Sequence, residues 1–243
     1  MDIENKQVEN KQENIENKPI ENTKQEEPEK KISDKGLIWA VAIIFIFLAA
    51  IFGLKFFYKD KEQLTLEKMT ALCLEGKIGE DQCYVYKGAY VFVKLEGLWY
   101  TRLQSEGIKV GIPLHFHPGD LVNVPITGSY NYSLFNQTPY FYITFDPLGT
   151  NLEYVALAIG EFDRNMLAAF GKTPIAACLV NETEACHLRP IINCTNTKEP
   201  VVFMKQSNDS AVILNNNCII IQGTGPDLVK STDRMLLSFY DIM

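Results

Sequence analysis

The chain has 243 residues, of which 47% are hydrophobic, and a formal net charge of −7 at pH 7. Residues 1–35 carry 7 lysines against 10 acidic residues, and residues 60–243 carry 14 basic against 20 acidic residues, so both polar parts are acidic. This balance argues against a nucleic-acid partner, because a protein that binds nucleic acid needs a basic surface to neutralise phosphates.

Residues 1–35 form a polar tail in which an aliphatic residue followed by Glu-Asn occurs four times. The aliphatic residues are Ile3, Val8, Ile15 and Ile20, and the tail has no aromatic residue. So little apolar area cannot offset the entropy of ordering the chain, and we therefore expect a disordered tail. The sharper alternative is a short linear motif that uses the four aliphatic residues to bind a cytoplasmic protein.

The run from Leu37 to Leu54 contains 18 residues without a charge. As an α-helix such a run is about 27 Å long, close to the roughly 30 Å hydrocarbon core of a bilayer. A cleaved signal peptide has a shorter apolar region near the start of the chain, whereas here a 35-residue polar tail comes first. We therefore predict a permanent transmembrane helix over residues 36–58 and an integral membrane protein with one span.

Lysines do not orient this span, because four lie close to it on each side. All six cysteines and all five Asn-X-Ser/Thr sequons follow the span. Paired cysteines and attached glycans both belong to oxidising, extracytoplasmic compartments. We therefore predict a cell-membrane protein with a cytoplasmic N-terminus and an extracytoplasmic domain over residues 59–243, a length that suits one domain.

The six cysteines predict three disulfides, because their number is even and a zinc knuckle places its cysteines two to four residues apart. Six cysteines allow 15 pairings, so spacing alone does not determine the connectivity. The nine-residue gap favours Cys73 with Cys83. For the other four we favour Cys178 with Cys186 and Cys194 with Cys218.

The sequons give five candidate glycosylation sites, at Asn131, Asn136, Asn181, Asn193 and Asn208. Random placement of the 12 asparagines and 20 serines or threonines of residues 60–243 gives about 1.3 sequons, fewer than the five present. The excess predicts a glycoprotein. Because a glycan needs solvent, we expect these asparagines on the surface.

The first half of the domain is rich in β-strand patterns after a short helix expected at 62–74. Strands are predicted at 83–86, 89–95, 98–103, 108–116, 120–124 and 140–145. The dipeptide Glu96-Gly97 is typical of a hairpin turn between two of these strands.

The second half alternates helices with strands. Thr150 to Glu153 match a capping box, and apolar residues then recur at spacings of three and four up to Phe170, which predicts a helix. Strands are predicted at 174–180, 201–205, 211–214 and 218–222, followed by a last helix over 226–240 with Thr224 as its cap. This order predicts an α+β domain in which two amphipathic helices cover one face of a mixed sheet.

His115 and His117 alternate with apolar residues, so on a strand both imidazoles would leave the same face. That geometry suits a metal ion, but a site needs three or four ligands, and Asp120 is the only carboxylate nearby. Two surface histidines are the simpler interpretation, and a metal or proton-transfer site is the alternative. We predict no cofactor.

Aromatic residues crowd the region that carries the first two sequons. These sequons predict an exposed loop over 128–138, with Phe135 in solvent. Phe141, Ile143 and Phe145 alternate as the buried face of a strand does. The alternative is that the aromatic side chains form a binding surface, as aromatic residues often do at interfaces.

Five short segments of the last third carry a family resemblance: Ile175-Ala-Ala-Cys178, Asn181-Glu-Thr-Glu-Ala-Cys186, Arg189-Pro-Ile-Ile192, Cys218-Ile-Ile-Ile-Gln-Gly223 and Leu228-Val-Lys-Ser-Thr-Asp-Arg234. In them the chain resembles uncharacterised single-pass membrane proteins of small, DPANN-type archaeal genomes. The resemblance implies an archaeal envelope protein and no particular activity, ligand or fold.

Together these observations predict a bitopic membrane-anchored envelope protein whose extracytoplasmic domain binds a protein or glycan partner. The chain has no G-x-S-x-G nucleophile elbow, and paired cysteines leave no thiolate nucleophile, so enzyme activity is the less favoured hypothesis. The alternative is an extracytoplasmic enzyme or metal-binding factor centred on His115 and His117.

Overall fold

The structure, a computed structural model, describes residues 38–39, 43–50, 66–105 and 108–243. Contacts divide the chain into two units, Met1–Lys55 and Phe56–Met243. In the first unit residues 43–50 are helical and their large apolar side chains are exposed. No helix in the described part of the chain has the length and apolar character needed to cross a bilayer. The predicted tail and much of the predicted span lie outside the described residues.

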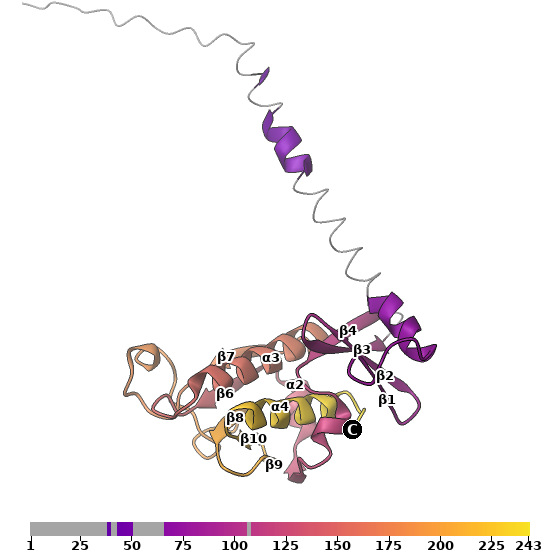
Figure 1. Ribbon diagram of the computed structural model, residues 1–243. Helices are drawn as coiled ribbons and strands as arrows, with labels where there is room; N and C mark the ends of the chain where they lie inside the picture. The colour runs from indigo at the N-terminus through magenta and orange to yellow at the C-terminus, as the bar shows by residue number, and fades with distance from the viewer. Residues whose placement is uncertain (1–37, 40–42, 51–65, 106–107) are drawn as a thin grey trace, which may run out of the picture. The chain divides into compact units, whose positions relative to one another are not determined.

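The second unit is α+β, as predicted, but it contains two sheets where the sequence predicts one (Figure 1). The first is antiparallel and has the order β1-β2-β3-β4. Its strands are β1 (Cys83–Tyr86), β2 (Tyr90–Leu95), β3 (Leu98–Ser105) and β4 (Ile108–Leu114). The predicted hairpin joins β2 to β3. Glu96 and Gly97 both have a positive φ, 50° and 89°, as a type I′ turn requires.

The second sheet has six strands in the order β5-β9-β10-β8-β6-β7 and is mixed, because only β9 and β10 pair antiparallel. Its strands are β5 (Ile126–Tyr130), β6 (Tyr140–Phe145), β7 (Thr173–Ala176), β8 (Val201–Gln206), β9 (Ala211–Asn216) and β10 (Cys218–Gly223). Gly128 has a φ of 90°, and a Cβ atom there would collide with the carbonyl oxygen of Leu214. Only glycine therefore allows β5 to pair with β9 in this way.

Both long helices predicted from the sequence are present, α3 (Leu152–Phe170) and α4 (Pro226–Phe239). They lie side by side against the six-stranded sheet (Figure 1). The predicted caps are wrong. The residues before the helices are Asn151 and Gly225, both with positive φ, and neither makes a side-chain cap hydrogen bond. A capping box needs an extended N-cap residue, so it cannot form from this left-handed entry.

One apolar core fills the space between the two helices and the sheet. Its largest fully buried side chains are Phe92, Phe135, Phe141, Phe162, Ile112, Leu114, Leu121, Ile143, Met166, Met204, Ile219 and Ile221. Residues from the four-stranded sheet belong to this same core, so the two sheets share one interior. A smaller cluster around Leu66, Cys73 and Val93 packs the helix over residues 66–74 on the four-stranded sheet.

Two strand predictions fail between residues 114 and 124, around Pro118. The strand predicted at 108–116 ends at Leu114, and residues 120–124 do not form a strand. A 3₁₀ turn, η1 (Pro118–Leu121), takes their place. Proline at the first position of this turn and the His117 side chain, which accepts a hydrogen bond from the Gly119 backbone nitrogen, explain why the chain turns here.

The predicted exposed loop over 128–138 is also wrong, because this segment contains the end of β5 and a short helix, α2 (Tyr132–Gln137). Asn131 caps the helix by accepting a hydrogen bond from the Leu134 backbone nitrogen. At the other end, Lys172 Nζ donates to the carbonyl oxygens of Phe135, Asn136 and Thr138 at 2.7–2.9 Å. A buried lysine thus satisfies the carbonyls that the helix end leaves free.

Phe135 is buried, with 2% of its surface exposed, and its ring packs on Phe239 and Phe141. The expectation that it lies in solvent is therefore wrong. Phe141 and Ile143 are buried as predicted, whereas Phe145 is half-buried. Tyr130, Phe135 and Phe141 therefore build the core, whereas Tyr132 is exposed and Tyr140 and Tyr142 are half-buried.

Two aromatic residues of α2 test this arrangement. Phe135→Ala removes a core ring and should lower the free energy of unfolding by about 3–5 kcal/mol. Tyr132→Ala on the same helix should cost under about 1 kcal/mol, because the Tyr132 side chain is exposed. Urea unfolding of the full chain in detergent, followed by circular dichroism, measures both. Equal small losses for the two variants would place Phe135 at the surface.

Candidate functional site

The predicted disulfide pairing is confirmed. Cys73 bonds to Cys83, Cys178 to Cys186 and Cys194 to Cys218, which leaves none of the six cysteines free. Two of these bonds fasten the loop over residues 177–200, which includes the 3₁₀ turn η2 (Glu184–Cys186). The Thr144 hydroxyl also donates to the Ile192 carbonyl oxygen at 2.9 Å. This long loop is therefore held in place and can contribute side chains to a site.

The structure places the five sequon asparagines at or near the surface. Asn131, Asn136, Asn181 and Asn208 are exposed. Asn193 is half-buried, and its Oδ1 accepts hydrogen bonds from the backbone nitrogens of the two residues that follow Cys194. Glycosylation of all five stays a prediction.

A pair of buried carboxyl groups joins α3 to α4. Glu161 is 4% exposed and Asp233 is fully buried. Asp233 Oδ2 accepts hydrogen bonds from the backbone nitrogens of His115 and Phe116, at 3.0 and 2.8 Å. His115 Nδ1 lies 2.7 Å from Glu161 Oε2. The cluster of His115, Glu161 and Asp233 therefore ties the residues that follow β4 to both helices.

The surroundings of this pair favour the protonated form of Asp233. Burial, followed by the neighbouring Glu161, raises the pKa of Asp233 well above its ordinary value, although the two backbone amides oppose the shift. Two carboxylates side by side in a buried site cannot both stay charged. Asp233 Oδ1 has no hydrogen-bond partner among the described residues, so a proton on this oxygen would be free to point toward Glu161.

His117 lies in a different environment from His115. Its ring stacks on Tyr84 with centroids 4.2 Å apart and meets the edge of Trp99 at 4.5 Å. Nδ1 accepts a hydrogen bond from the Gly119 backbone, and Nε2 lies 3.3 Å from Asp120 Oδ2. Burial lowers the pKa of His117, and Asp120 opposes that shift. His117 therefore fits its site as a neutral ring that donates from Nε2.

The two histidines thus contact different partners and do not face one common site. The part of the chain that the structure describes holds no group of three or more His, Cys, Asp or Glu arranged to bind a metal ion. Sequence reasoning named His115 but missed Glu161 and Asp233. Both are acidic residues on the apolar faces of their helices, and this position is the one sequence feature that could have identified them.

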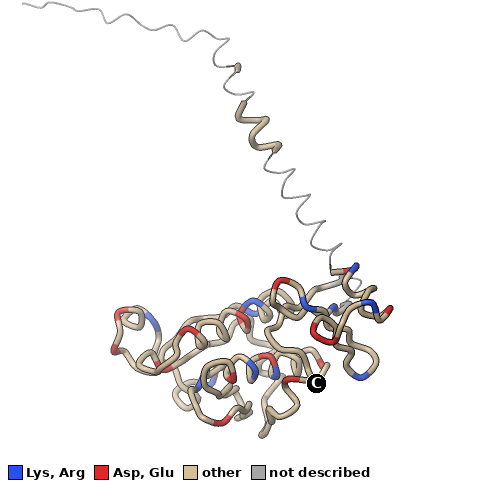
Figure 2. The backbone as a smooth tube through the Cα atoms, in the orientation of Figure 1, with Lys and Arg blue, Asp and Glu red and all other residues tan. Residues whose placement is uncertain are grey.

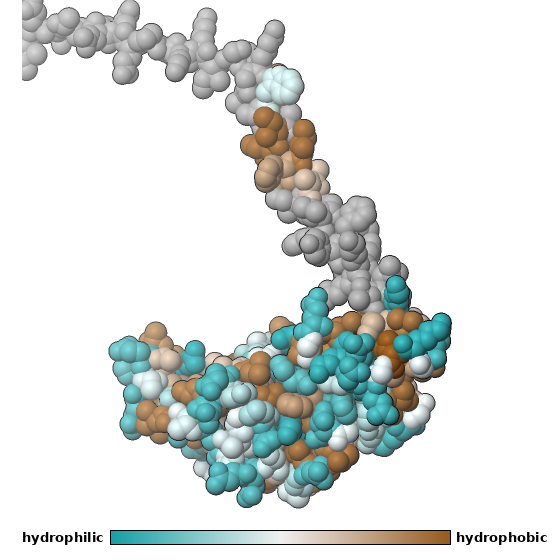
Figure 3. All heavy atoms as spheres, in the orientation of Figure 1, coloured by the Kyte–Doolittle hydropathy of each residue, from teal (hydrophilic) through white to brown (hydrophobic). Residues whose placement is uncertain are grey.

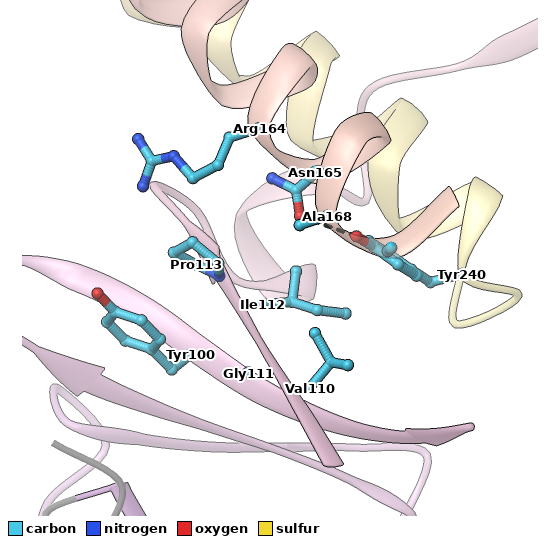
Figure 4. Close-up of a pocket in the computed structure, with 10 residues that line it drawn as sticks. Tyr100, Val110, Gly111, Ile112, Pro113, Arg164, Asn165, Ala168 and Tyr240 are labelled. Carbon is cyan, nitrogen blue, oxygen red and sulfur yellow. Dashed lines mark hydrogen bonds between the residues drawn. The ribbon is translucent and has the colours of Figure 1, made fainter. Parts of the chain in front are cut away.

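A pocket of about 250 Å³ lies between β4 and the C-terminal half of α3 (Figure 4). Residues 110–113 of β4 line one side, and Arg164 and Asn165 line the other. The Tyr240 hydroxyl donates to Asn165 Oδ1 at 2.9 Å, and Asn165 Nδ2 donates to the Glu161 carbonyl oxygen at 2.9 Å. Asn165 is therefore held rigidly between the pocket and the buried carboxyl pair.

A second hollow of about 510 Å³, the α3 groove, runs along the N-terminal half of α3. Its walls are mostly apolar and come from α3, the end of β6 and the loop over 177–200, with Phe145, Leu152, Ile159, Ala185 and Arg189 among them. Leu148 and Leu152 are 57% and 37% exposed. Apolar residues also appear in patches on the face of the domain shown in Figure 3.

Charge does not mark either hollow as a nucleic-acid site. Along the described backbone, lysine and arginine positions are interspersed with aspartate and glutamate positions (Figure 2). The α3 groove has one cationic residue, Arg189, and the pocket beside β4 has one, Arg164.

No protein-family model, no curated protein and no solved structure matches this chain. The resemblance to small-genome archaeal membrane proteins stays an expectation from the sequence.

The proton on Asp233 predicts a pH dependence of stability. The folded-state pKa lies above the unfolded value near 4, so the stabilisation is fully present below pH 4 and is lost as the pH rises through the folded-state pKa. Asp163, whose pKa burial raises to about 7, acts in the same direction. Asp233→Asn keeps both amide hydrogen bonds and a donor to Glu161 without titrating, and should flatten this slope.

Asp233→Ala leaves two buried backbone amides without an acceptor and should lower the free energy of unfolding by about 3 kcal/mol or more. Asp227→Asn is the matched control, because Asp227 lies on the same helix but pairs with Lys230 at the surface. Urea unfolding between pH 4 and 8 measures all three variants. An Asn variant as unstable as the Ala variant, or with the wild-type slope, would show that Asp233 carries no proton.

Proposed function

We propose that this chain is a bitopic envelope protein with a cytoplasmic tail over residues 1–35, a transmembrane helix over 36–58 and an extracytoplasmic domain over 59–243 that binds a partner protein. The uncharged run from Leu37 to Leu54 supports the anchor. Three disulfides and five sequons, all after that run, support the orientation.

The observation that carries the binding role is the α3 groove. Its volume of about 510 Å³ lies within the range of ligand-binding hollows, and a disulfide-fastened loop forms one wall. Leu152, which lines the groove, is 37% exposed, and covering such an apolar side chain with a partner is favourable because it removes apolar surface from water. A mostly apolar groove of this kind suits a protein partner.

A glycan partner fits this groove less well. Sugar-binding surfaces offer exposed aromatic faces beside polar groups, and the aromatic residues Phe135 and Phe141 are buried in the core. Among the groove residues Phe145 is the one aromatic side chain, and it is half-buried.

A proton-transfer site at His115 is the second candidate. The Glu161 carboxyl group lies 2.7 Å from the imidazole and orients it, as carboxyl groups orient catalytic imidazoles, and Glu161 in turn lies beside Asp233, whose pKa is raised. Among the described residues, however, the His115 ring hydrogen-bonds only with Glu161. No nucleophile there completes a catalytic set, so binding is the better supported function.

Protease treatment of whole cells tests the topology. With one epitope tag before residue 35 and another after Met243, the N-terminal tag should survive and the C-terminal tag should be digested. Permeabilised cells are the control, in which both tags should be lost. Survival of the C-terminal tag with loss of the N-terminal one would reverse the proposed orientation.

Two leucines of α3 test the groove. Leu152 lines it, whereas Leu167 is exposed near the other end of the same helix. After crosslinking in native membranes, a partner protein should be captured by the wild type and by Leu167→Asp, and its yield should fall at least tenfold with Leu152→Asp. Unchanged urea unfolding checks that both variants fold. Capture that ignores Leu152, or equal loss in the two variants, would rule the groove out.

A further inference from the structure

We propose that the pocket between β4 and α3 binds the C-terminal carboxylate of an extended peptide, with Arg164 as the anion-binding group and Gly111 as the backbone partner. This site is separate from the α3 groove, so either one can fail without the other.

The hairpin turn determines which way the backbone groups of the first sheet point. Leu95 and Leu98 flank a two-residue type I′ turn, so they form a hydrogen-bonded pair and the Leu98 backbone points toward β2. Backbone direction alternates along a strand. The Trp99 backbone therefore points toward β4, where its partner is Leu114.

The same alternation along β4 makes Pro113 and Gly111 face outward. β4 is the last strand of its sheet, so no strand of the described residues pairs with its outward groups. Among the described residues, no backbone hydrogen bond outside the sheet involves Gly111 or Pro113. Proline at the outward position fits this assignment, because edge strands use proline where a donor would otherwise point into solvent.

The pocket lies at this free edge. The consecutive residues 110–113 all line it, as expected of a hollow beside a strand, because side chains on one face of a strand alternate. An extended peptide can therefore bond to the outward N–H and C=O of Gly111, as added strands do.

Pro113 limits how far such a peptide can extend. It offers a carbonyl oxygen but no N–H, so a longer added strand would leave one of its own carbonyls unpaired there. A peptide whose chain ends at this point leaves no carbonyl unpaired. The edge thus favours the end of a peptide over its middle.

Arg164 supplies the charge that a chain end needs. Figure 4 shows its side chain extending from α3 on the side of Pro113 and Tyr100. Arg164 makes no salt bridge or side-chain hydrogen bond with the residues that the structure describes, whereas Arg102 on β3 pairs with Glu67 at 3.0 Å. A planar guanidinium matches a carboxylate in a two-pronged hydrogen bond.

The size of the pocket agrees with this ligand. A volume of about 250 Å³ lies below the roughly 300–1,000 Å³ of pockets for drug-sized molecules, so it suits a chain end with one side chain. Ile112 and Tyr240 give that side chain apolar contacts.

Fluorescence anisotropy with three pentapeptide pools tests the site on the full chain in detergent. All pools carry an N-terminal fluorophore. The first has a free C-terminal acid and no Asp or Glu, the second is the same pool with an amide end, and the third has an amide end and one internal Glu. The free-acid pool should bind at least tenfold more tightly than either other pool, as the loss of a charged hydrogen bond implies.

Arg164→Gln should weaken binding of the free-acid pool at least tenfold. Arg189→Gln, which changes the arginine of the α3 groove, is the matched control and should bind as the wild type does. Leu152→Asp should also bind normally, which separates this site from the proposed partner groove. Equal binding of acid and amide pools, tighter binding of the internal-Glu pool, indifference to Arg164→Gln or no binding by folded protein would each overturn the proposal.

Discussion

The contact between Glu161 and Asp233 places two carboxyl groups in the apolar interface of α3 and α4. Two buried charges without compensation would cost several kcal/mol each, which is a large part of the total stability of a domain, so we expect this pair to carry a proton. The pair accepts hydrogen bonds from both backbone amides that follow β4 and meets the His115 ring. The four-stranded sheet is thereby joined to the helical layer of the other sheet by polar contacts as well as by the shared core.

The position of this pair explains why α3 can form two different hollows. Glu161 lies near the middle of the helix, between the groove residues at 152–160 and the pocket residues at 164–169. Fixing the helix at its centre fixes the N-terminal half against the disulfide-bonded loop and the C-terminal half beside β4. Asn165, one turn further along the helix, donates to the Glu161 backbone carbonyl oxygen, accepts from Tyr240 and lines the pocket. Both hollows therefore lie on one helix whose centre carries this buried contact.

The features that were predicted correctly are those that depend on residues close together in the sequence. The hairpin at Glu96-Gly97 and the long helix ending at Gly171 follow from turn chemistry and apolar spacing. Cys73 and Cys83 also pair as their short separation suggests.

Three of the failures come from contacts between distant residues. Phe135 looked exposed because two sequons flank it, yet Lys172 satisfies the end of its helix and Phe239 covers its ring. Glu161 and Asp233 lie on separate helices, so no local pattern pairs them. The division into two sheets likewise depends on tertiary packing.

The central claim is that a buried carboxyl group in this interface is protonated at neutral pH. Infrared difference spectroscopy of the full chain at pH 7 measures it directly, because the C=O stretch of a protonated carboxylic acid is separate from that of a carboxylate. Asp163, whose pKa is about 7, also contributes at this pH, so Asp163→Asn serves as the background. In that background the spectrum should contain such a band, and adding Asp233→Asn should remove it while adding Asp227→Asn leaves it in place. An Asp163→Asn spectrum without the band, or a band that survives the added Asp233→Asn, would contradict the account.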